Sequence, residues 1–350
     1  MDEKNLSSSI IRIAHGAGGL LQNELIEFIT KGVSLRNVKN GIGLDELDDG
    51  ATIPLTNSNE DLVITADGHT IHPLFFPGGD LGKLSACGTI NDLIMMGARP
   101  IAITSIIIIE EGLEFEILDK IIKSFNAVLE QANVAIIAGD SKVMPKGTIS
   151  GMIMATTGIG IKNKNIKILD NNLKPGDKII LTGSIGDHGI ALISSREGIS
   201  FSTELKSDLD MLLDIYNAIK EEMKLNQIHA MKDPTRGGIA AALNDWAVKS
   251  NIGINLDEEK ILIKREVNAT CDMLGLDPYA IACEGRALLA VDPRYSEEIL
   301  EKLRKTKNGS EARIIGEVSK ENPKRVLLKT LVGGTRILDM PLGEPIPRIC

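Results

Sequence analysis

Apolar and polar positions along this 350-residue chain repeat with two different periods, and each period predicts a different kind of element. Short runs rich in β-branched residues predict strands, and Ile101–Ile109 reads as a fully buried one. Stretches in which apolar residues recur every three or four positions predict amphipathic helices at 82–97 and 114–132. Strands and helices follow one another in both halves of the chain, and no internal repeat is visible. We therefore expect an α/β (α+β) fold.

Further strands and helices follow the same patterns. In the first half strands are expected at 62–65, 134–138 and 150–157. In the second half we expect helices at 203–224, 239–250, 264–275 and 295–306, and strands at 178–182, 253–256, 286–291, 312–318 and 326–329.

Turn and breaker residues divide the chain into three parts. A polar stretch, 163–174, ends at Lys174-Pro-Gly-Asp177, which predicts a domain boundary. Three prolines among the last ten residues forbid a helix there and favour an extended arm. We therefore expect a first domain over 1–165, a second α/β domain with a mixed sheet over 166–335, and a mobile arm over 336–350.

Composition excludes several classes of function. Apolar residues make up 43% and charged residues 25%, as in ordinary soluble proteins. A net charge of −9 argues against nucleic acid or an anionic membrane as the main partner. The longest apolar run is too short to span a bilayer, and the N-terminus lacks a signal segment, so we expect a cytoplasmic protein. Four cysteines without CxxC spacing indicate reduced thiols, not a zinc site.

Five aspartates stand at positions where carboxylates often bind ligands: Asp49, Asp67, Asp92, Asp140 and Asp233. They follow predicted strands, lie in Gly-rich turns or interrupt an apolar helix. Clustered together they would repel one another, and Mg²⁺ with a polyphosphate would relieve that repulsion. Taken singly, each is explained equally well as a helix cap or a surface residue.

Two glycine-rich segments are candidate anion sites. His15-Gly-Ala-Gly-Gly19 precedes a predicted helix, and a turn explains its glycines equally well. Asp233-Pro-Thr-Arg-Gly-Gly238 also precedes a helix, where an N-cap is the alternative explanation. The segment around Gly78 and Gly79 is not a Walker-type phosphate loop, because the first glycine and the final Ser or Thr are missing.

The predicted arm ends on a thiol, Cys350, which suits a carrier that enters a narrow pocket. The α-carboxylate raises the pKa of such a thiol, whereas Arg348, on the same side of an extended chain, would lower it. A frayed terminus that happens to end in cysteine is the alternative.

Six segments carry distinctive motifs: Phe75-Phe-Pro-Gly-Gly-Asp-Leu-Gly-Lys-Leu84, Cys87-Gly-Thr-Ile-Asn-Asp92, Gly139-Asp-Ser-Lys142, Gly186-Asp-His-Gly189, Asp233-Pro-Thr-Arg-Gly-Gly238 and Pro347-Arg-Ile-Cys350. Together they resemble, end to end, the HypE family of hydrogenase maturation proteins. These are carbamoyl dehydratases within the aminoimidazole-ribonucleotide-synthetase-like ATP-using superfamily. Gly50 and Ser141 are small departures from the usual pattern.

The resemblance implies a synthetase-like fold in which the first domain forms a homodimer through a shared β-barrel and binds ATP near the second domain. It implies that Cys350 accepts a carbamoyl group from the carbamoyltransferase HypF. ATP-dependent dehydration would then leave a thiocyanate for the HypC–HypD complex, which supplies cyanide ligands to [NiFe]-hydrogenase.

That chemistry requires Mg²⁺–ATP, a cation near the transferred phosphoryl group and a base near the carbamoyl nitrogen. We expect Cys350, Lys142, His229 and Glu284 to be catalytic, with a satisfied core histidine as the alternative for His229. The residues expected to bind the nucleotide are Asp49, Asp67, Gly78, Gly79, Asn91, Asp92, Asp140, Asp233 and Arg236, and the five aspartates among them are the expected metal ligands.

Other functions remain open from the residues alone. A sister activity, such as selenophosphate synthesis or thiamine-phosphate phosphorylation, would not need the thiol of Cys350. An ATP-sensing scaffold for metallocluster assembly would perform no chemistry on its own chain.

Overall fold

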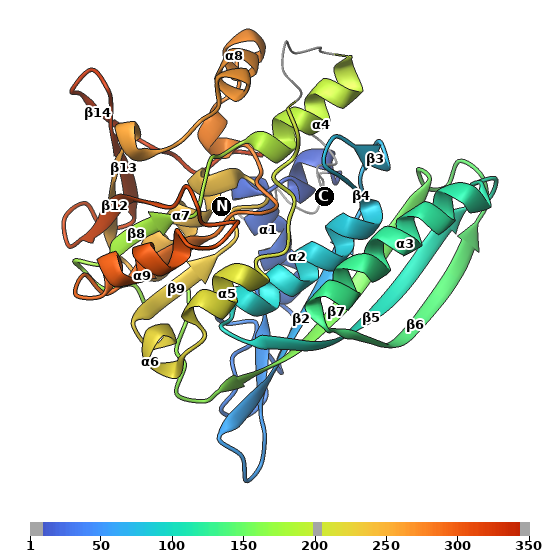
Figure 1. The fold of residues 1–350 in the computed structure, drawn as a ribbon, viewed down its shortest axis with the longest axis horizontal. Coiled ribbons are helices and arrows are strands. Elements are labelled where there is room, and N and C mark those ends of the chain that lie inside the picture. The colour runs from blue at the N-terminus through green and yellow to red at the C-terminus, as the bar shows by residue number, and fades with distance from the viewer. Residues whose placement is uncertain (1–9, 199–204, 344–350) are drawn as a thin grey trace.

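The computed structural model describes residues 10–198 and 205–343, which form two sheets and the helices packed on them (Figure 1). The first sheet has five strands in the order β1-β2-β7-β5-β6. These are β1 (Ala51–Pro54), β2 (Glu60–His69), β5 (Arg99–Glu110), β6 (Ala135–Met144) and β7 (Met152–Asn163). Neighbouring strands are antiparallel except β5 and β6, which run parallel because helix α3 (Phe115–Ala132) connects them. A short hairpin, β3 (Phe75–Phe76) and β4 (Gly79–Asp80), lies outside both sheets.

Helix α2 (Leu81–Met95) lies on the first sheet beside α3. Asp80 caps it by accepting a hydrogen bond of 2.9 Å from the backbone N–H of Lys83. Gly82 permits a close approach to α3, because a Cβ there would overlap the carbonyl oxygen of Ile121. Every residue of α2 except Lys83 and Asp92 is buried, so the helix is enclosed on all sides.

The second sheet has seven strands in the order β14-β13-β10-β12-β8-β11-β9. These are β8 (Lys178–Leu181), β9 (Ile228–Lys232), β10 (Gly253–Asp257), β11 (Leu288–Val291), β12 (Arg313–Ser319), β13 (Arg325–Lys329) and β14 (Thr335–Ile337). Only β10 and β13 pair in parallel. Helices cover both faces, which explains why the consecutive residues Ile179, Ile180 and Leu181 are all buried.

The helices of the second domain are α4 (Asp187–Glu197), α5 (Leu213–Ile219), α6 (Glu222–Leu225), α7 (Gly238–Lys249), α8 (Arg265–Leu274) and α9 (Ser296–Leu303). Helix α7 packs on one side of the sheet through Ile239, Leu243 and Trp246. Helices α5 and α9 pack on the other side, where they join the core that also contains α2.

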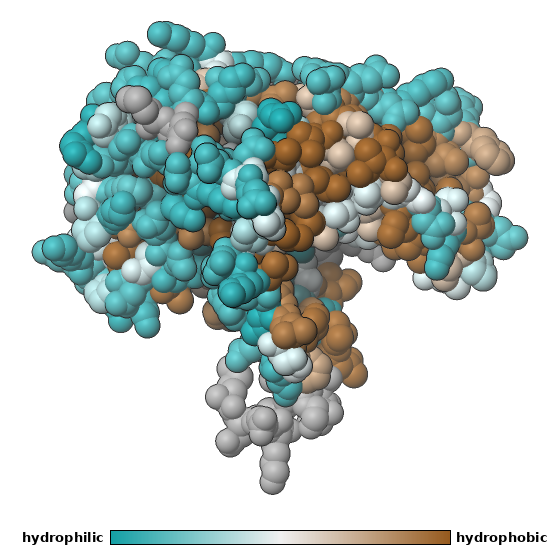
Figure 2. Space-filling model, turned by 90° about the horizontal axis from the view of Figure 1, so that it is seen from below, coloured by the Kyte–Doolittle hydropathy of each residue, from teal (hydrophilic) through white to brown (hydrophobic). Residues whose placement is uncertain are grey.

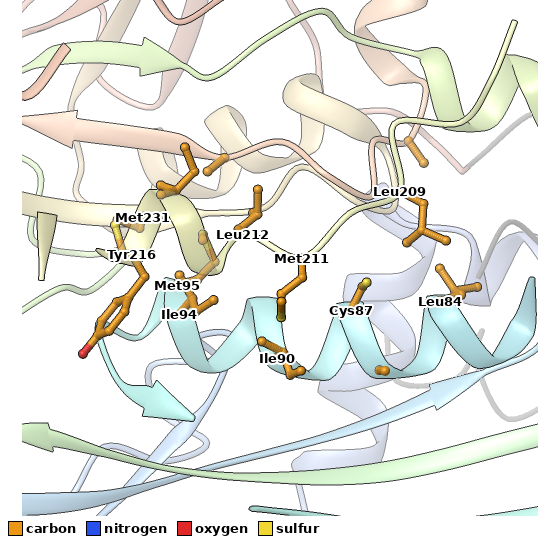
Figure 3. Close-up of a cluster of buried hydrophobic side chains, with 14 of the residues drawn as sticks. Leu84, Cys87, Ile90, Ile94, Met95, Leu209, Met211, Leu212, Tyr216 and Met231 are labelled. Carbon is orange, nitrogen blue, oxygen red and sulfur yellow. The ribbon is translucent and has the colours of Figure 1, made fainter. Parts of the chain in front are cut away.

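One apolar core therefore runs across both domains. Figure 3 shows side chains of α2 facing side chains that belong to the second domain. The α2 residues are Leu84, Cys87, Ile90, Ile94 and Met95, and those opposite are Leu209, Met211, Leu212, Tyr216 and Met231. Burial of this many apolar side chains fixes how the domains sit relative to each other. The site between them is consequently built on a rigid frame.

Four predictions of local structure are wrong. The helix expected over 203–224 is replaced, within the described residues, by an irregular segment followed by α5 and α6. Strand β2 continues through Asp67, and β6 continues through 139–142, so these polar residues lie within strands and not beyond them. Strand β5 is buried only in its first half, because no element among the described residues covers the far side of its second half.

Strand β6 is the exposed edge of the first sheet, where every residue except Met144 is exposed. Ile106 on β5 and Ile136, Ile137 and Val143 on β6 leave apolar surface open to solvent. Figure 2 shows apolar side chains gathered on the side of the molecule where Figure 1 places β5 and β6. An unpaired apolar edge strand is a typical site of association. Over residues 10–198 and 205–343, no helix combines the length and apolar character needed to cross a membrane.

Candidate functional site

A cavity of about 760 Å³ lies between the two domains. The first domain contributes helix α1 (Gly19–Thr30), the loop before β1, the end of β2 and one face of α2. The second contributes the end of β9, helix α7 with the turn before it, and Glu284. The charged side chains that line it are Glu27, Arg36, Asp48, Asp49, Asp67, Asp92, Lys232, Asp233, Arg236, Asp245, Lys249 and Glu284. Eight carboxylates against four cations make the cavity a site for added positive charge.

Four of the five aspartates predicted to bind metal line this cavity: Asp49, Asp67, Asp92 and Asp233. Asp92 is one of two residues of α2 that are not buried as whole residues, and its Oδ2 accepts a hydrogen bond of 2.7 Å from Thr65 Oγ1 on β2. Asp233 follows β9 directly. The antiparallel and crossover connections therefore bring together carboxylates that lie as far apart in the sequence as positions 49 and 233.

The crowding of these carboxylates perturbs their titration. Burial raises the pKa of Asp92 well above its ordinary value, and the nearby Asp67 and Asp233 raise it further. Burial, followed by repulsion from Asp49, raises the pKa of Asp233 to about 8. Burial, Asp170 and Asp49 likewise raise the pKa of Asp48 to about 8. These groups are therefore ready to bind a cation in exchange for protons.

A network of buried ion pairs forms one wall of the cavity. Lys232 Nζ lies 3.2 Å from Asp49 Oδ1 and 2.7 Å from Asp170 Oδ2. Lys249 Nζ lies 2.8 Å from the same oxygen of Asp170, and Trp246 Nε1 donates to its other oxygen at 2.6 Å. Burial by itself would raise the pKa of Asp170. Attraction to Lys232 and Lys249 outweighs the effect of burial and lowers this pKa to about 2. Lys232 accordingly stays charged beside Asp49.

Glu284 reaches the cavity from the loop before β11. Its backbone is fixed from two sides, because its N–H donates to Asp208 Oδ2 at 3.2 Å and its carbonyl accepts from Asn91 Nδ2 at 3.4 Å. Burial raises the pKa of its carboxyl group well above the ordinary value, with Asp233 and Asp208 adding to the effect. A buried carboxyl with a raised pKa suits proton transfer at neutral pH.

The lining fits Mg²⁺ held together with phosphate oxygens. Asp49 Oδ2 and Glu284 Oε1 are buried and have no hydrogen-bond partner among the described residues. No three His, Cys, Asp or Glu side chains in that part of the chain already form a metal-binding group. Mg²⁺ commonly takes only one or two carboxylates and completes its shell with water and phosphate. Arg236, 3.8 Å from Asp67, and the N-terminus of α7 lie where a phosphate would need positive partners.

Four predicted nucleotide-binding residues lie outside this cavity: Gly78, Gly79, Asn91 and Asp140. A Cβ on Gly78 would lie 2.9 Å from the backbone of Ser207, and one on Gly79 would lie 2.6 Å from Leu209. Both glycines therefore allow the β3–β4 hairpin to pack closely against the second domain. Asn91 ties α2 to the same domain, because its Oδ1 accepts from the N–H of Leu212 at 2.9 Å. Within one chain Gly78, Gly79 and Asn91 hold the two domains together and do not contact the cavity.

His229 also lies away from the cavity. Its Nδ1 is 2.8 Å from Asp177 Oδ2 and its Nε2 is 2.9 Å from Lys174 Nζ, and the ring is buried. This is the arrangement of a satisfied core histidine. Asp140 and Lys142 lie on the exposed strand β6 and do not line the cavity. Cys350 lies outside the described residues.

Sequence reasoning missed several residues of the site: Asp48, His69, Asp170, Lys232, Asp245 and Lys249. Asp48 and Lys232 are direct neighbours of predicted ligands, which was a usable signal. His69 Nε2 lies 3.2 Å from Asp67 Oδ2, two positions along β2 on the same face. Asp170 gave no signal, since it is a single carboxylate in a polar linker and its partners come from β9 and α7.

The fold and the cavity together define a class of protein with two α/β domains and an acidic site between them. The N-terminal domain of AIR synthase related proteins matches residues 47–162, and the C-terminal domain of the same family matches residues 174–329. Both matched domains contribute to the cavity, which places the site at their junction.

Similarity to individual proteins is more specific. The chain is 49% identical over 337 residues to a putative hydrogenase expression/formation protein of Methanocaldococcus jannaschii, covering 96% of this chain and 98% of the relative. It is 37% identical to carbamoyl dehydratase HypE of Azotobacter vinelandii over the whole of both chains. A solved HypE–HypF complex matches with a TM-score of 0.83 and 37% identity over 92% of this chain and 100% of the other. HypE in complex with ATP matches with a TM-score of 0.80 and 35% identity over 97% and 100%. The chain therefore belongs to the HypE family of hydrogenase maturation proteins.

Proposed function

We propose that this protein is a carbamoyl dehydratase that uses Mg²⁺–ATP to convert a thiocarboxamide on Cys350 into a thiocyanate. One observation carries the proposal: the carboxylate-rich cavity has, at its rim, the segment that leads to Cys350. Met340 lines the cavity, and the carbonyl oxygen of Pro341 accepts a hydrogen bond of 2.9 Å from the N–H of Leu20. The full-length similarity to HypE, including a HypE solved with ATP, supports the same chemistry here.

The reaction balances as a dehydration driven by ATP. The carbonyl oxygen of the S-carbamoyl group attacks the γ-phosphorus of ATP, and the bond to the β-phosphate oxygen breaks to release ADP. A base then removes the protons of the carbamoyl nitrogen as the C–O bond breaks and phosphate leaves. The net change is Cys–S–C(O)NH₂ plus ATP to Cys–S–C≡N plus ADP, phosphate and a proton. A phosphorylated oxygen is a good leaving group, whereas an amide oxygen is not.

The cavity residues suit separate parts of this reaction. Asp49, Asp67, Asp92 and Asp233 would hold Mg²⁺, which would offset their mutual repulsion and draw charge from the transferred phosphoryl group. Arg236 would bind the phosphates. Glu284, whose pKa burial raises, would take a proton from the carbamoyl nitrogen after giving up its own proton when the cation binds. His229 has no role in this reaction, because both of its ring nitrogens already contact Asp177 and Lys174.

The other three cysteines are poor alternatives as carriers. Cys87, Cys271 and Cys283 are all buried. Burial raises the pKa of each thiol, to about 11 in the case of Cys271. A buried thiol that stays protonated is neither accessible nor nucleophilic. This supports Cys350 as the one acceptor.

The family resemblance also implies partners. We propose that HypF donates the carbamoyl group, that the HypC–HypD complex accepts cyanide, and that the reaction takes place in the cytoplasm. The solved HypE–HypF complex supports the first of these.

We also propose that the protein works as a homodimer through β5 and β6. The exposed apolar residues of these strands need a cover, and an open sheet cannot close into a barrel without a second copy. Asp140 and Lys142 lie on this surface, so covering it would bury two charges that then need partners. Their roles as metal ligand and electrophilic cation therefore belong with the dimer.

Intact-mass spectrometry tests the proposal. After incubation with HypF, carbamoyl phosphate and ATP, wild-type protein should gain one carbamoyl group on Cys350 and then lose the mass of one water. Cys350→Ala should gain nothing yet bind ATP normally, and Cys271→Ala should behave as wild type. A carbamoyl group on the Cys350→Ala protein would exclude Cys350 as the carrier.

A further inference from the structure

The N-terminus of helix α1 is already occupied by the chain itself. The sequence motif His15–Gly19 suggested an anion site here. Instead, Gly18 N–H donates to Gln22 Oε1 at 2.7 Å, Leu20 N–H donates to Pro341 O at 2.9 Å, and Leu21 N–H donates to Leu342 O at 3.3 Å. The helix has no side-chain N-cap, so these carbonyl oxygens satisfy donors that would otherwise lack partners. A part of the arm thus caps α1.

Glycine is required for this contact. Gly19 has a φ of +75°, and a Cβ there would overlap the carbonyl oxygen of Pro341. A Cβ on the neighbouring Gly18 would lie 2.8 Å from the backbone of Arg236. The start of α1 is therefore in close contact with both the arm and the turn that carries a cavity residue. These two close approaches explain Gly18 and Gly19 of the motif.

We propose that the turn Gly18–Leu21 is the anchor of the C-terminal arm, and that it commits Cys350 to the cavity of its own chain. This inference rests on the proposed function of Cys350. Met340 and Gly19 both line the cavity, so the anchored part of the arm lies at the cavity's own rim. Gly343 packs against Ala14 next to the anchor, and seven residues, 344–350, follow it. Seven residues span at most about 23 Å, and they follow a segment whose Met340 already lines the cavity.

Loss of the anchor would lengthen the tether. The next fixed position before it is Leu338, whose N–H donates to Val326 O at 2.8 Å in the second sheet. The chain between fixed point and thiol would grow from seven to twelve residues, 339–350. Effective concentration falls roughly as the −3/2 power of tether length, so we expect about a two-fold lower concentration of the thiol at the cavity. Without the anchor the arm would also no longer leave the fold at the cavity, which lowers the effective concentration of the thiol further.

Two pairs of variants isolate the anchor. Gly19→Ala places a methyl group against Pro341, whereas Gly16→Ala adds one where no atom lies within 4 Å. Leu20→Pro removes the N–H that donates its hydrogen bond to the carbonyl oxygen of Pro341, and proline is tolerated in the first turn of a helix. Leu20→Ala keeps that N–H and is the control. Only the first member of each pair should release the arm.

Amide hydrogen exchange reports the anchor without any carbamoyl chemistry. In wild-type protein the N–H of Leu21 should exchange about 30-fold more slowly than an uncapped helix end, which corresponds to about 2 kcal/mol. Gly19→Ala and Leu20→Pro should lose this protection, and Gly16→Ala and Leu20→Ala should keep it. Protection that survives in Gly19→Ala and Leu20→Pro would overturn the anchor.

Mass spectrometry then tests the commitment to one chain. Cys350→Ala protein, which has an intact cavity, is mixed with carbamoylated Asp92→Asn protein, which has an intact arm. We expect no thiocyanate on the Asp92→Asn chain, and its appearance would overturn action within one chain. Gly19→Ala alone should convert its own thiocarboxamide at least about two-fold more slowly than Gly16→Ala, and equal rates would overturn the positioning role. If wild-type Cys350 never accepts a carbamoyl group, the proposed function fails, and exchange at Leu21 still decides whether the anchor exists.

Discussion

Asp233→Asn should stabilise the nucleotide-free protein while it weakens the site. The carboxyl group of Asp233 is buried beside Asp49, and its pKa rises from an ordinary 3.8 to about 8. At pH 7 this carboxyl group is ionised in the unfolded chain but protonated in the folded protein, so folding must supply the free energy of protonation. The cost is 1.36 kcal/mol for each pH unit above 3.8, or about 4 kcal/mol. Asparagine avoids it, because the amide carries no charge at any pH.

The sign of the pH dependence follows from the direction of the shift. A group whose folded pKa is raised contributes stability below its unfolded pKa, and that stability is lost as the pH rises toward the folded value. The gain in unfolding free energy from Asp233→Asn should therefore be about 2 kcal/mol at pH 5 and should increase steadily up to pH 8. Asp49 and Lys232 share the perturbation, so these values are upper limits.

Asp170→Asn is the matched control with the opposite sign. Its pKa is lowered to about 2 because Lys232 and Lys249 outweigh burial. Ionised Asp170 then contributes about 2 kcal/mol, fully present above pH 4 and lost only as the pH falls through 2. Replacing it by asparagine should destabilise the protein by at least that amount at both pH 5 and pH 7, since two lysines lose their shared partner.

Denaturant unfolding of nucleotide-free protein at pH 5 and pH 7 checks both variants. Asp233→Asn should unfold at higher denaturant than wild type, with the larger difference at pH 7, and Asp170→Asn should unfold at lower denaturant at both. Addition of Mg²⁺–ATP should favour wild type over Asp233→Asn. The reasoning is refuted if Asp233→Asn is no more stable than wild type at pH 7, or if its advantage is the same at pH 5.

Three further outcomes are expected. Asp92→Asn should lower the Mg²⁺-dependent affinity for ATP at least about ten-fold by calorimetry, while Asp119→Asn on the exposed face of α3 leaves it unchanged; equal affinities would exclude the metal cluster. The affinity for Mg²⁺–ATP should rise from pH 6 to pH 8, because Asp92 and Asp233 must release protons to bind the metal. Calorimetry in buffers of different ionisation enthalpy would detect these protons. Binding without proton release would contradict the prediction. Ile137→Asp on β6 should sediment as a monomer at micromolar concentration, whereas Leu331→Asp in the second domain should not; a monomeric wild type would rule out the proposed dimer.

Most individual elements were accessible from the sequence, because local pattern decides them. The helical period over 114–132 and the apolar run over 101–109 correspond to α3 and β5. Strand β9 was not predicted, since it carries His229 and Lys232, whose polar groups find partners only in the folded chain. Exposure of the apolar residues in these strands could not be foreseen either, because Ile106 to Ile109 of β5 and Ile136 and Ile137 of β6 are as apolar as residues of buried strands.

The sequence by itself determined the chemistry available to the site: aspartates that can bind a cation, an arginine three residues after Asp233, and a thiol at the last position. Tertiary structure alone decided which of these residues meet. It gathered Asp49, Asp67, Asp92 and Asp233 around one cavity and left Asp140 on the opposite edge of the sheet. It also placed Pro341 against Gly19, at the position where the sequence had suggested an anion site. The reason is physical: residue type fixes what a side chain can bind, but distances between residues far apart in sequence are set by strand order and packing.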